Sequence, residues 1–368
     1  MRVLMTADPI GGVWSYALTL CAALASEDVC VELATLGAPL SRAQRSAVAA
    51  LANVELHESR YRLEWMPHPW EDLAAAGDWL LALKEERRCS LIHLNHLLHG
   101  ELAWGVPVLT VGHSCVLSWW SAVRREPAPR QWEPYRRCVM QSLQAASCVV
   151  APTHAMLWEL QRYYGPLPRS RVIPNAAEDW GAGALGGPVE KELFILCAGR
   201  LWDEGKNVAA LGAVAPLLPW PIHVAGRQVG PDGSFANLAG VHALGHLEPH
   251  ALAQWYARAA IYALPARYEP FGLTVLEAGL HGCALVLGDI ESLQELWGDA
   301  AIYVPPEDTQ ALQAALNALI ADPHRRRALA CRARARARSY SPARMLEGYR
   351  VLYRELIREH RACAVSAS

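Results

Sequence analysis

Short apolar runs alternate with amphipathic stretches along most of the chain, and this alternation sets the expected elements. In the first half, the stretches between the apolar runs carry hydrophobic residues at helical spacing, as in VWSYALTLCAALAS. The strand-like runs of this half are RVLMTA, VCVELATLG, SLIHLN, VPVLTVGHS and ASCVVAPT. Continuous apolar runs are typical of strands buried on both faces, so we expect a parallel sheet covered by helices.

A change of composition near residue 180 divides the chain. The segment EDWGAGALGGPVEKE, residues 178–192, is rich in glycine and lacks periodicity. We interpret it as an interdomain linker, with a long surface loop as the alternative. The rhythm then restarts with the runs LFILCAGRL, PIHVAGRQ, VHALGHL, AIYALPA, CALVLGD and AIYVPP. The sequence therefore predicts an α/β protein of two Rossmann-like, doubly wound domains, residues 1–180 and 181–368. We expect them to face a central cleft and to bind ligands at the carboxyl ends of their strands.

Composition and charge narrow the classes of function. The 368 residues are 52% hydrophobic with a formal net charge of −2, which gives no electrostatic case for nucleic-acid binding. The arginines of PHRRRALACRARARARSYS spread around a helix, so a solvated helix is favoured over a nucleic-acid patch. The ten cysteines form no C-x-x-C pair, no apolar run reaches the length of a membrane span, and MRVLMTADPIGG leads directly into a strand. We therefore expect a cytoplasmic protein, at most peripheral to a membrane.

The stretch RYEPFGLTVLEAGLHG is the strongest candidate for chemistry. It holds Glu269 and Glu277 on either side of a turn at Gly272, and a helix is expected to begin at Leu273 and Thr274. The free backbone amides at such a helix start bind anions, and phosphate in particular. Glu277 would then accept hydrogen bonds from a ribose diol, and Glu269 would meet sugar hydroxyls. The alternative is that Glu277 complements the helix dipole and Glu269 is a loop charge.

Two cations follow the first strand of the second half. Arg200 and Lys206 lie in AGRLWDEGKN, on the loop expected at the ligand edge. Two cations aimed at one diphosphate would stabilise a leaving group, whereas ordinary surface charge is the alternative.

Histidines are weaker candidates. His113, at the strand end in TVGHSC, would on its own be a structural residue. His93, His96 and His99 recur every third residue in HLNHLLHG, but without a paired carboxylate we favour one face of a short helix or turn over a metal site.

Together these motifs resemble glycosyltransferase family 4, whose members have the GT-B fold. The motifs that carry the resemblance are GGVWSYALTLCAAL, VGHSC, VIPNA, AGRLWDEGKN and ARYEPFGLTVLEAGLHGCALV. The resemblance implies donor-binding roles for Arg200, Lys206, Glu269, Phe271, Gly272, Leu273, Thr274 and Glu277. It also implies that Gly11 and Gly12 approach the donor, that His113 lies beside the transferred sugar, and that the last helix, about residues 342–360, packs back on the N-terminal domain.

The same resemblance implies a reaction. A hexosyl unit would move from a nucleoside-diphosphate sugar to a hydroxyl acceptor with retention of configuration, on a front-face path in which the departing diphosphate helps to deprotonate the acceptor. His113, Glu269, Arg200 and Lys206 would be the catalytic group, with no metal and no cofactor. The alternatives are a sugar-nucleotide 2-epimerase, a sugar phosphorylase and a non-catalytic binding module. A dinucleotide oxidoreductase is disfavoured because DPIGGVW lacks G-x-G-x-x-G.

The acceptor is expected to be a glycan or a lipid-linked saccharide of cell-surface polysaccharide synthesis. The segment Val116–Arg137 combines three tryptophans with five arginines, which suits either a carbohydrate platform or peripheral contact with the inner face of the plasma membrane. The structural alternative is that the tryptophans pack under a surface helix and the arginines are solvated. These residues are Trp119, Trp120, Trp132, Arg124, Arg125, Arg130, Arg136 and Arg137.

Overall fold

The computed structural model describes residues 1–177, 190–230 and 233–366, which form two compact units. The first unit holds residues 1–121, 126–175 and the chain from Pro342 onward, and the second holds residues 122–125 and 176–341. The chain thus passes from the first unit to the second inside the VIPNA motif, between Asn175 and Ala176. Most of the predicted linker, residues 178–189, lies outside the described residues.

The first unit is built on a seven-stranded parallel sheet with the strand order β3-β2-β1-β4-β5-β6-β7. Its strands are β1 (Arg2–Ala7), β2 (Cys30–Thr35), β3 (Val54–Glu58), β4 (Leu91–Leu94), β5 (Val108–Val111), β6 (Cys148–Ala151) and β7 (Ser170–Val172). Its helices are α1 (Gly12–Leu24), α2 (Arg42–Ala49), α3 (Trp70–Arg87), α4 (Val116–Arg124), whose end belongs to the second unit, α5 (Glu133–Ala145), α6 (His154–Tyr164) and α13 (Pro342–Ser366).

The second unit repeats this design on a six-stranded parallel sheet with the order β10-β9-β8-β11-β12-β13. Its strands are β8 (Glu192–Ala198), β9 (Ile222–Ala225), β10 (His242–Gly245), β11 (Ala259–Leu264), β12 (Ala284–Gly288) and β13 (Ile302–Val304). Its helices are α7 (Val208–Val214), α8 (Pro249–Arg258), α9 (Leu273–Leu280), α10 (Glu291–Trp297), α11 (Thr309–Ala321) and α12 (Pro323–Ala337). Short 3-10 helices are η1 (Ala25–Glu27), η2 (Arg130–Trp132), η3 (Glu204–Lys206), η4 (Ala215–Leu217) and η5 (Gly298–Ala300).

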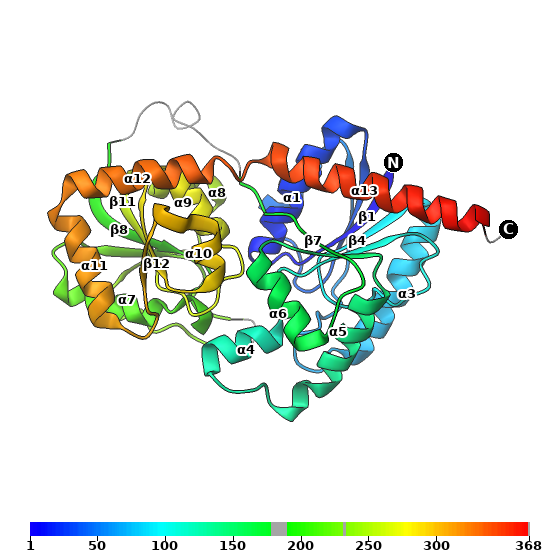
Figure 1. Cartoon of the computed structure of the whole chain (residues 1–368), viewed down its shortest axis with the longest axis horizontal. Helices are drawn as coiled ribbons and strands as arrows, with labels where there is room; N and C mark the ends of the chain where they lie inside the picture. The colour runs from blue at the N-terminus through cyan, green and yellow to red at the C-terminus, as the bar shows by residue number, and fades with distance from the viewer. Residues whose placement is uncertain (178–189, 231–232, 367–368) are drawn as a thin grey trace. The chain divides into compact units, whose positions relative to one another are not determined.

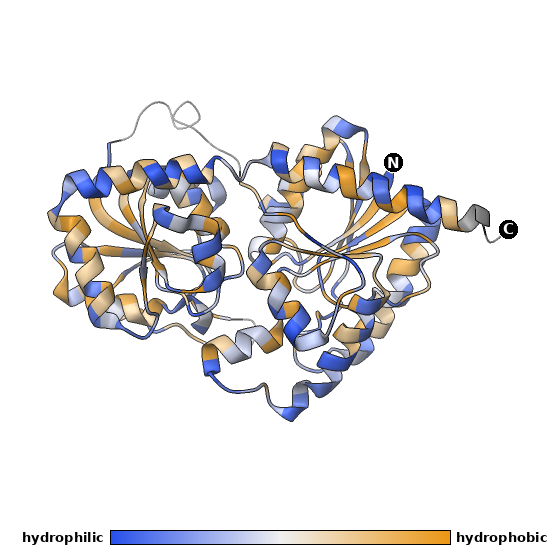
Figure 2. Cartoon of the chain, viewed as in Figure 1, coloured by the Kyte–Doolittle hydropathy of each residue, from blue (hydrophilic) through white to orange (hydrophobic). Residues whose placement is uncertain are grey.

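In each unit, helices cover both faces of the sheet (Figure 1), and the strands carry most of the hydrophobic colour (Figure 2). All six residues of β11 are buried, which explains why that strand reads as a continuous apolar run. The predicted pair of doubly wound parallel domains is confirmed. The prediction missed β3 and β7, because β3 alternates charged with apolar residues and β7 has only three residues.

The last two helices differ in their surroundings. Helix α13 counts with the first unit, where it packs against α1 and buries Tyr349 and Tyr353 completely. Helix α12 is not simply a solvated helix, because its alanine face, with Ala333 and Ala337 fully buried, packs against α9 and β12. Its Arg336 donates hydrogen bonds to carbonyl oxygens of α10.

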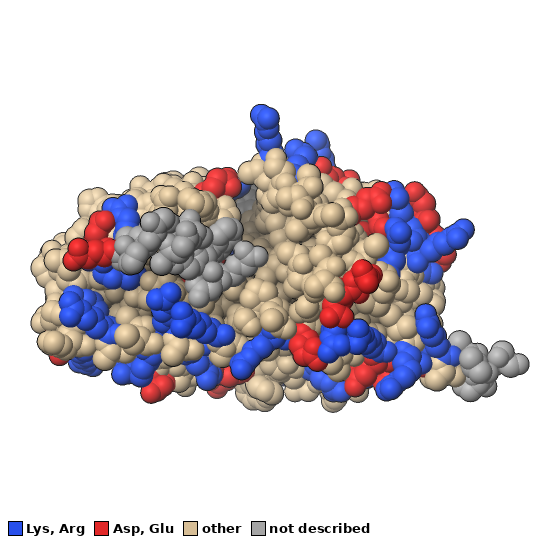
Figure 3. Space-filling model, turned by 90° about the horizontal axis from the view of Figure 1, so that it is seen from above, with Lys and Arg blue, Asp and Glu red and all other residues tan. Residues whose placement is uncertain are grey.

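The surface seen in Figure 3 interleaves basic with acidic side chains.

Candidate active site

Two loops at the carboxyl edge of the second sheet bring Lys206 and Glu269 together. Lys206 ends the short helix that follows β8, and Glu269 follows β11, the neighbouring strand. The Lys206 ammonium donates to a Glu269 carboxylate oxygen at 2.6 Å, and the side chains are only 11% and 12% exposed. This contact joins two of the predicted site residues that lie 63 positions apart.

Backbone contacts hold these two loops in register. The Gly205 carbonyl oxygen accepts hydrogen bonds from the amides of Arg267 and Tyr268 at 2.8 and 3.2 Å. On the other side, the Ser292 hydroxyl of α10 donates to the Glu269 carbonyl oxygen at 2.6 Å. Sequence reasoning missed Ser292, because nothing in the local pattern ESLQE shows what its hydroxyl reaches.

A further residue that sequence reasoning missed is Asn207. It adopts a left-handed backbone conformation, with φ of 56°, and its amide donates to the carbonyl oxygens of Pro265 and Pro306 at 2.9 and 2.7 Å. Positive φ at a residue other than glycine marks Asn207 in the structure, but φ cannot be read from a sequence, so no sequence signal pointed to it.

Arg200, the second predicted cation, lies on the same loop as Lys206. Its guanidinium donates to the Asp203 carboxylate at 2.9 Å and packs over the Trp202 ring, with 39% of the side chain exposed. Asp203 is 5% exposed and also accepts from the Gly205 amide at 2.9 Å. Each predicted cation is therefore paired with a carboxylate of the protein itself.

The turn before α9 matches the expected anion-binding geometry. Gly272 has φ of 85°, and a Cβ there would lie 3.0 Å from Val275, so the turn requires glycine. Helix α9 begins at Leu273, so the first amides of the helix lack partners within it. The Thr274 hydroxyl accepts a hydrogen bond from Tyr262 at 2.8 Å. Phe271 is 5% exposed and packs edge-on against Tyr340, which limits any donor contact of this residue to its backbone.

Glu277 lies one turn inside α9 and is partly exposed. Burial raises the pKa of its carboxyl to about 7, and the neighbouring Tyr256 hydroxyl acts in the opposite direction. A carboxylate that has lost much of its water gains most from hydrogen-bond donors supplied by a ligand. The two ribose hydroxyls of a nucleotide would be such donors.

In the first unit, His113 follows β5 and forms a hydrogen bond from Nε2 to the Asn95 Oδ1 atom at 2.9 Å. The Tyr16 ring meets it edge-on at 4.5 Å between centroids. Desolvation by the surrounding atoms lowers the pKa of the His113 imidazole to about 3, so the ring is neutral. Gly11 and Gly12 are exposed at the start of α1, which carries Tyr16.

The other three histidines were expected on one face of a short helix or turn, and the structure divides them between a strand and the turn after it. His93 lies on β4, whereas His96 and His99 lie in the turn after it, and all three are buried. His96 and His99 hydrogen-bond to each other at 2.8 Å, and the outer nitrogens of this pair reach Thr6 and the Leu73 carbonyl oxygen. Desolvation lowers the pKa of each ring, so these histidines form a neutral buried network.

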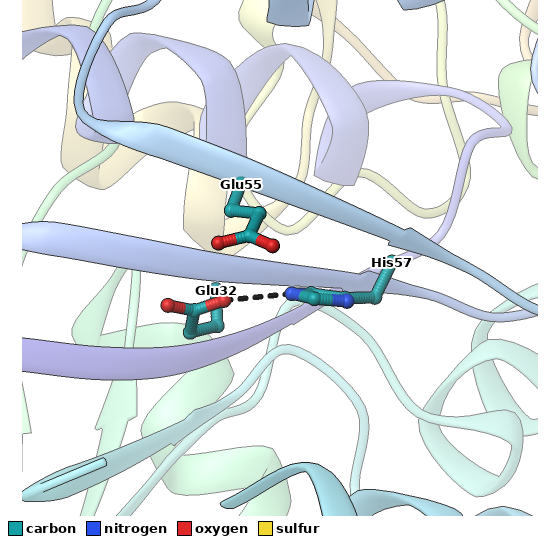
Figure 4. A group of neighbouring side chains, drawn as sticks. All are labelled: Glu32, Glu55 and His57. Carbon is teal, nitrogen blue, oxygen red and sulfur yellow. Dashed lines mark hydrogen bonds and ion pairs between the residues drawn. The ribbon is translucent and has the colours of Figure 1, made fainter. Parts of the chain in front are cut away.

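A group with metal-ligand chemistry lies elsewhere in the first unit. Figure 4 shows Glu32 on β2 close to Glu55 and His57 on β3, with a 2.7 Å contact between His57 and Glu32. Arg2 pairs with Glu32, and Arg87 pairs with Glu55 at 2.8 Å. The arginines supply the positive charge that a metal ion would otherwise provide, so we interpret the group as an ion-pair network.

The segment Val116–Arg137 is less free than the sequence suggested. Arg124 forms two 2.8 Å bonds to Glu204, and Arg136 pairs with Glu133 at 2.8 Å. Trp132 is partly buried against the core around Tyr135. Several of these residues therefore have structural contacts, as in the alternative considered above. In the part of the chain that the structure describes, no helix is long and apolar enough to cross a membrane.

The predicted residues thus fall into two groups. The first unit holds Gly11, Gly12 and His113 at the carboxyl edge of its sheet, and the second unit holds the remaining residues at the carboxyl edge of its own. That second group comprises Arg200, Lys206, Glu269, Phe271, Gly272, Leu273, Thr274 and Glu277.

Comparison with known proteins matches both halves of the chain. The family model described as Glycosyltransferase Family 4 matches residues 10–179, and the model described as Glycosyl transferases group 1 matches residues 192–322. The chain is 28% identical over 328 residues to a D-inositol 3-phosphate glycosyltransferase of Kineococcus radiotolerans, covering 75% of this chain and 74% of that protein.

Solved structures share the fold. Sucrose-phosphate synthase from Thermosynechococcus elongatus superposes with a TM-score of 0.78 at 21% identity, covering 98% of this chain and 100% of that one. HepE of Anabaena in complex with UDP-glucose gives a TM-score of 0.73 at 18% identity, covering 97% and 100%.

The fold and the matching family models together define the class of protein. The protein is a glycosyltransferase enzyme with the GT-B fold. Within this class its first half matches the Glycosyltransferase Family 4 model and its second half matches the Glycosyl transferases group 1 model, as the sequence motifs predicted.

Proposed function

We propose that the protein transfers a hexosyl unit from a nucleoside-diphosphate sugar to a hydroxyl acceptor, with retention of configuration and without a metal ion. The observation that carries this proposal is the set of groups at the carboxyl edge of the second sheet. There a 2.6 Å Lys206–Glu269 pair, the turn at Gly272 and a desolvated Glu277 share two neighbouring loops and one helix. The name of the inositol phosphate relative and the UDP-glucose bound to HepE support a nucleotide-sugar donor.

Donor binding would exchange partners at the two cations. A diphosphate carries the negative charge that Asp203 and Glu269 now supply to Arg200 and Lys206. Once Lys206 turns to the phosphates, the Glu269 carboxylate becomes available to the hydroxyls of the transferred sugar. The cations and the first amides of α9 would then stabilise charge on the leaving diphosphate, which is where it develops as the glycosidic bond breaks.

Glu277 would take the ribose and His113 would lie beside the sugar, as the family resemblance implies. A diphosphate oxygen on the same face of the sugar would accept the proton of the incoming hydroxyl. Positioning and charge stabilisation, rather than a covalent intermediate, would then lower the barrier.

For the acceptor we propose a glycan or a lipid-linked saccharide, used in cell-surface polysaccharide synthesis on the cytoplasmic side of the membrane. The support is the cluster of tryptophans and arginines in Val116–Arg137, of which Arg130 and Arg137 are exposed. Flotation with anionic liposomes tests the membrane part of this proposal. A wild-type protein that stays in the soluble fraction at low salt would argue for a soluble acceptor.

A thermal-shift screen against UDP-, GDP- and ADP-sugars tests donor binding, because a ligand of the folded state raises the melting temperature. Product analysis with and without acceptor then identifies the reaction. A new glycoside that forms only with acceptor and keeps the donor's anomeric configuration supports the proposal. An epimerised nucleotide sugar, or donor binding without turnover in the presence of glycan acceptors, would contradict it.

A further inference from the structure

Asn95 is buried directly behind the candidate catalytic histidine. It follows β4, is 7% exposed, and lies at the same sheet edge as His113, which follows the neighbouring strand β5. Its side chain makes hydrogen bonds at both ends, and this fixes which end is oxygen and which is nitrogen.

The nitrogen end is identified by its partner. Asn95 Nδ2 lies 2.8 Å from the carbonyl oxygen of Thr6 on β1, and a carbonyl oxygen can only accept a hydrogen bond. The Asn95 backbone amide also donates to the Thr6 hydroxyl at 2.9 Å, which holds the residue against β1. The other end of the amide is therefore Oδ1, a pure acceptor, and it faces the histidines.

This acceptor determines which of the two ring nitrogens of His113 carries the proton. The Nε2 atom lies 2.9 Å from Asn95 Oδ1, so Nε2 must carry the proton that is shared in this bond. A neutral ring with a proton on Nε2 has none on Nδ1, which is left as a hydrogen-bond acceptor. The ring is indeed kept neutral, since desolvation lowers the pKa of His113 to about 3.

The groups packed around this pair are themselves neutral. Tyr16 contacts His113 edge-on, and its hydroxyl lies 3.2 Å from Nε2 of His93. His93 Nε2 also lies 3.2 Å from Asn95 Oδ1, and Tyr353 of α13 bonds to the Nδ1 atom of His93 at 2.6 Å. Burial raises the pKa of both tyrosines and lowers that of His93, so none of these groups supplies a charge that would favour an imidazolium.

We propose that Asn95 is a positioning residue that locks His113 in the Nε2-protonated tautomer, so that His113 meets the sugar as a hydrogen-bond acceptor. In this state His113 Nδ1 accepts a hydrogen bond from a sugar hydroxyl, and the ring neither donates a hydrogen bond from this atom nor acts as a cation toward the diphosphate. The part that concerns the sugar rests on the proposed function, whereas the tautomer is a property of the protein alone.

Two-bond proton–nitrogen NMR spectra of the full chain labelled with ¹⁵N-histidine test the lock without any substrate. The His113 signals are assigned by their loss in His113→Gln. We expect the wild-type ring to show the Nε2-protonated pattern throughout pH 5 to 8. An Nδ1-protonated or imidazolium pattern in this range would overturn the proposal.

Two substitutions of Asn95 separate positioning from folding. Asn95→Asp keeps the size of the side chain but places a carboxylate against Nε2, so an imidazolium signal from His113 is expected to appear as the pH falls. Asn95→Leu removes the acceptor and is expected to mix the two tautomers. The control is Asn53→Leu, which likewise removes a partly buried side-chain amide, here one that donates to two backbone carbonyl oxygens, and it should leave the His113 pattern unchanged. A His113 pattern that is identical in wild type and both Asn95 variants would refute the lock.

Kinetics of the same variants test the sugar contact. Asn95→Leu is expected to lower kcat/KM by about tenfold, the equivalent of one lost hydrogen bond, while nucleotide affinity stays within about twofold. A confirmed tautomer together with an unchanged kcat/KM in Asn95→Leu would show that the lock exists but that His113 does not act on the sugar. Failure of the wild type to bind any nucleotide sugar would instead contradict the proposed function and leave the spectral result intact.

Discussion

At the scale of single residues, the candidate site is defined by charges that are already paired. Lys206 and Glu269 contact each other at 2.6 Å while both are nearly buried, and Arg200 contacts Asp203. A ligand that enters such a site must replace one charge partner with another. Substitution of a carboxylate therefore has effects opposite to those of substitution of a cation.

Glu269→Gln is expected to raise nucleoside-diphosphate affinity a few-fold while lowering turnover at least tenfold. The neutral amide of Gln no longer forms an ion pair with the Lys206 ammonium, so Lys206 becomes available to the phosphates. The same amide binds sugar hydroxyls less strongly than a carboxylate does, so turnover falls. Calorimetric titration with nucleotide and initial rates measure the two effects. A parallel loss of affinity and turnover would show that Glu269 acts through the loop structure.

Arg200→Ala and Lys206→Ala are each expected to lower kcat by roughly 10²–10³, the scale of losing one group that stabilises charge in a transition state. Initial rates with saturating donor measure this, and addition of EDTA to the wild-type enzyme should change nothing. A strict requirement for Mg²⁺ or Mn²⁺ would contradict the metal-free mechanism. Arg258→Ala, which removes a surface ion pair with Glu192, is the control for a simple loss of charge.

Glu277→Gln is expected to stabilise the protein at pH 8 and to change little at pH 5. The folded-state pKa of Glu277 is raised from 4.5 to about 7, so its contribution to stability is present below pH 4.5 and is lost as the pH rises through 7. The neutral amide avoids this loss, which amounts to at most roughly 3 kcal/mol. Urea unfolding at both pH values measures it.

The exposed Glu126→Gln serves as the control for the simple loss of a carboxylate and should leave the urea midpoint unchanged. In parallel, nucleotide affinity of Glu277→Gln should fall, because ribose loses its charged acceptor. Gain of stability without loss of affinity would remove Glu277 from the binding site.

At the scale of elements, the site depends on how tightly α9 is held from behind. Its first turn faces the candidate phosphate site, and its opposite side packs against α12 and α10. Gly279 is the contact point, since a Cβ there would lie 2.8 Å from the Trp297 ring and 3.2 Å from Ala337. The small residues of α12 therefore influence the candidate site indirectly, because they set the position of α9.

Gly279→Ala is expected to destabilise the protein by about 1–2 kcal/mol, although alanine favours helix, because overpacking outweighs the gain in propensity. Gly77→Ala in α3 is the matched control. The Cβ that it introduces meets the end of the flexible Leu102 side chain at 3.2 Å, so this substitution should be neutral or slightly stabilising. Denaturant midpoints of the two variants decide the matter, and equal midpoints would refute the tight α9–α12 contact.

At the scale of the whole molecule, the chain returns to its first unit at the end. Helix α13 buries Met345, Tyr349, Leu352, Tyr353 and Leu356 there, and Tyr353 hydrogen-bonds to His93. The second unit has its own continuous core, which does not include α13. The two units therefore differ in their dependence on the last segment of sequence.

Truncation before Pro342 is expected to expose the core of the first unit and to leave the second unit folded. Hydrogen exchange should then accelerate in β1 and β4, whereas β8 and β11 keep their protection, and nucleotide should still raise the melting temperature of the second unit. Truncation after Cys363 is the control and should change neither unit. Uniform loss of protection throughout the chain would show that the two units fold as one.

The sequence alone determined most of the strands along the chain and the loops that carry the candidate site residues. Strands covered on both faces are mostly apolar, so eleven of the thirteen strands in the described part of the chain were visible as apolar runs, and the candidate residues followed them. Gly272 and the helix start after it were equally predictable, because turn and capping preferences are local. The edge strand β3 was not predicted, because its alternating charged and apolar residues resemble a surface loop.

The tertiary structure alone decided which groups meet. Lys206 and Glu269 are 63 residues apart, and Asn95 reaches His113 only because β4 and β5 are neighbours in the sheet. The partners of a hydrogen bond and the desolvation that moves the pKa of Glu277 or His113 depend on atoms brought together by folding. Local sequence preferences carry no record of such contacts, and this is why sequence reasoning found the catalytic candidates but missed the residues that hold them.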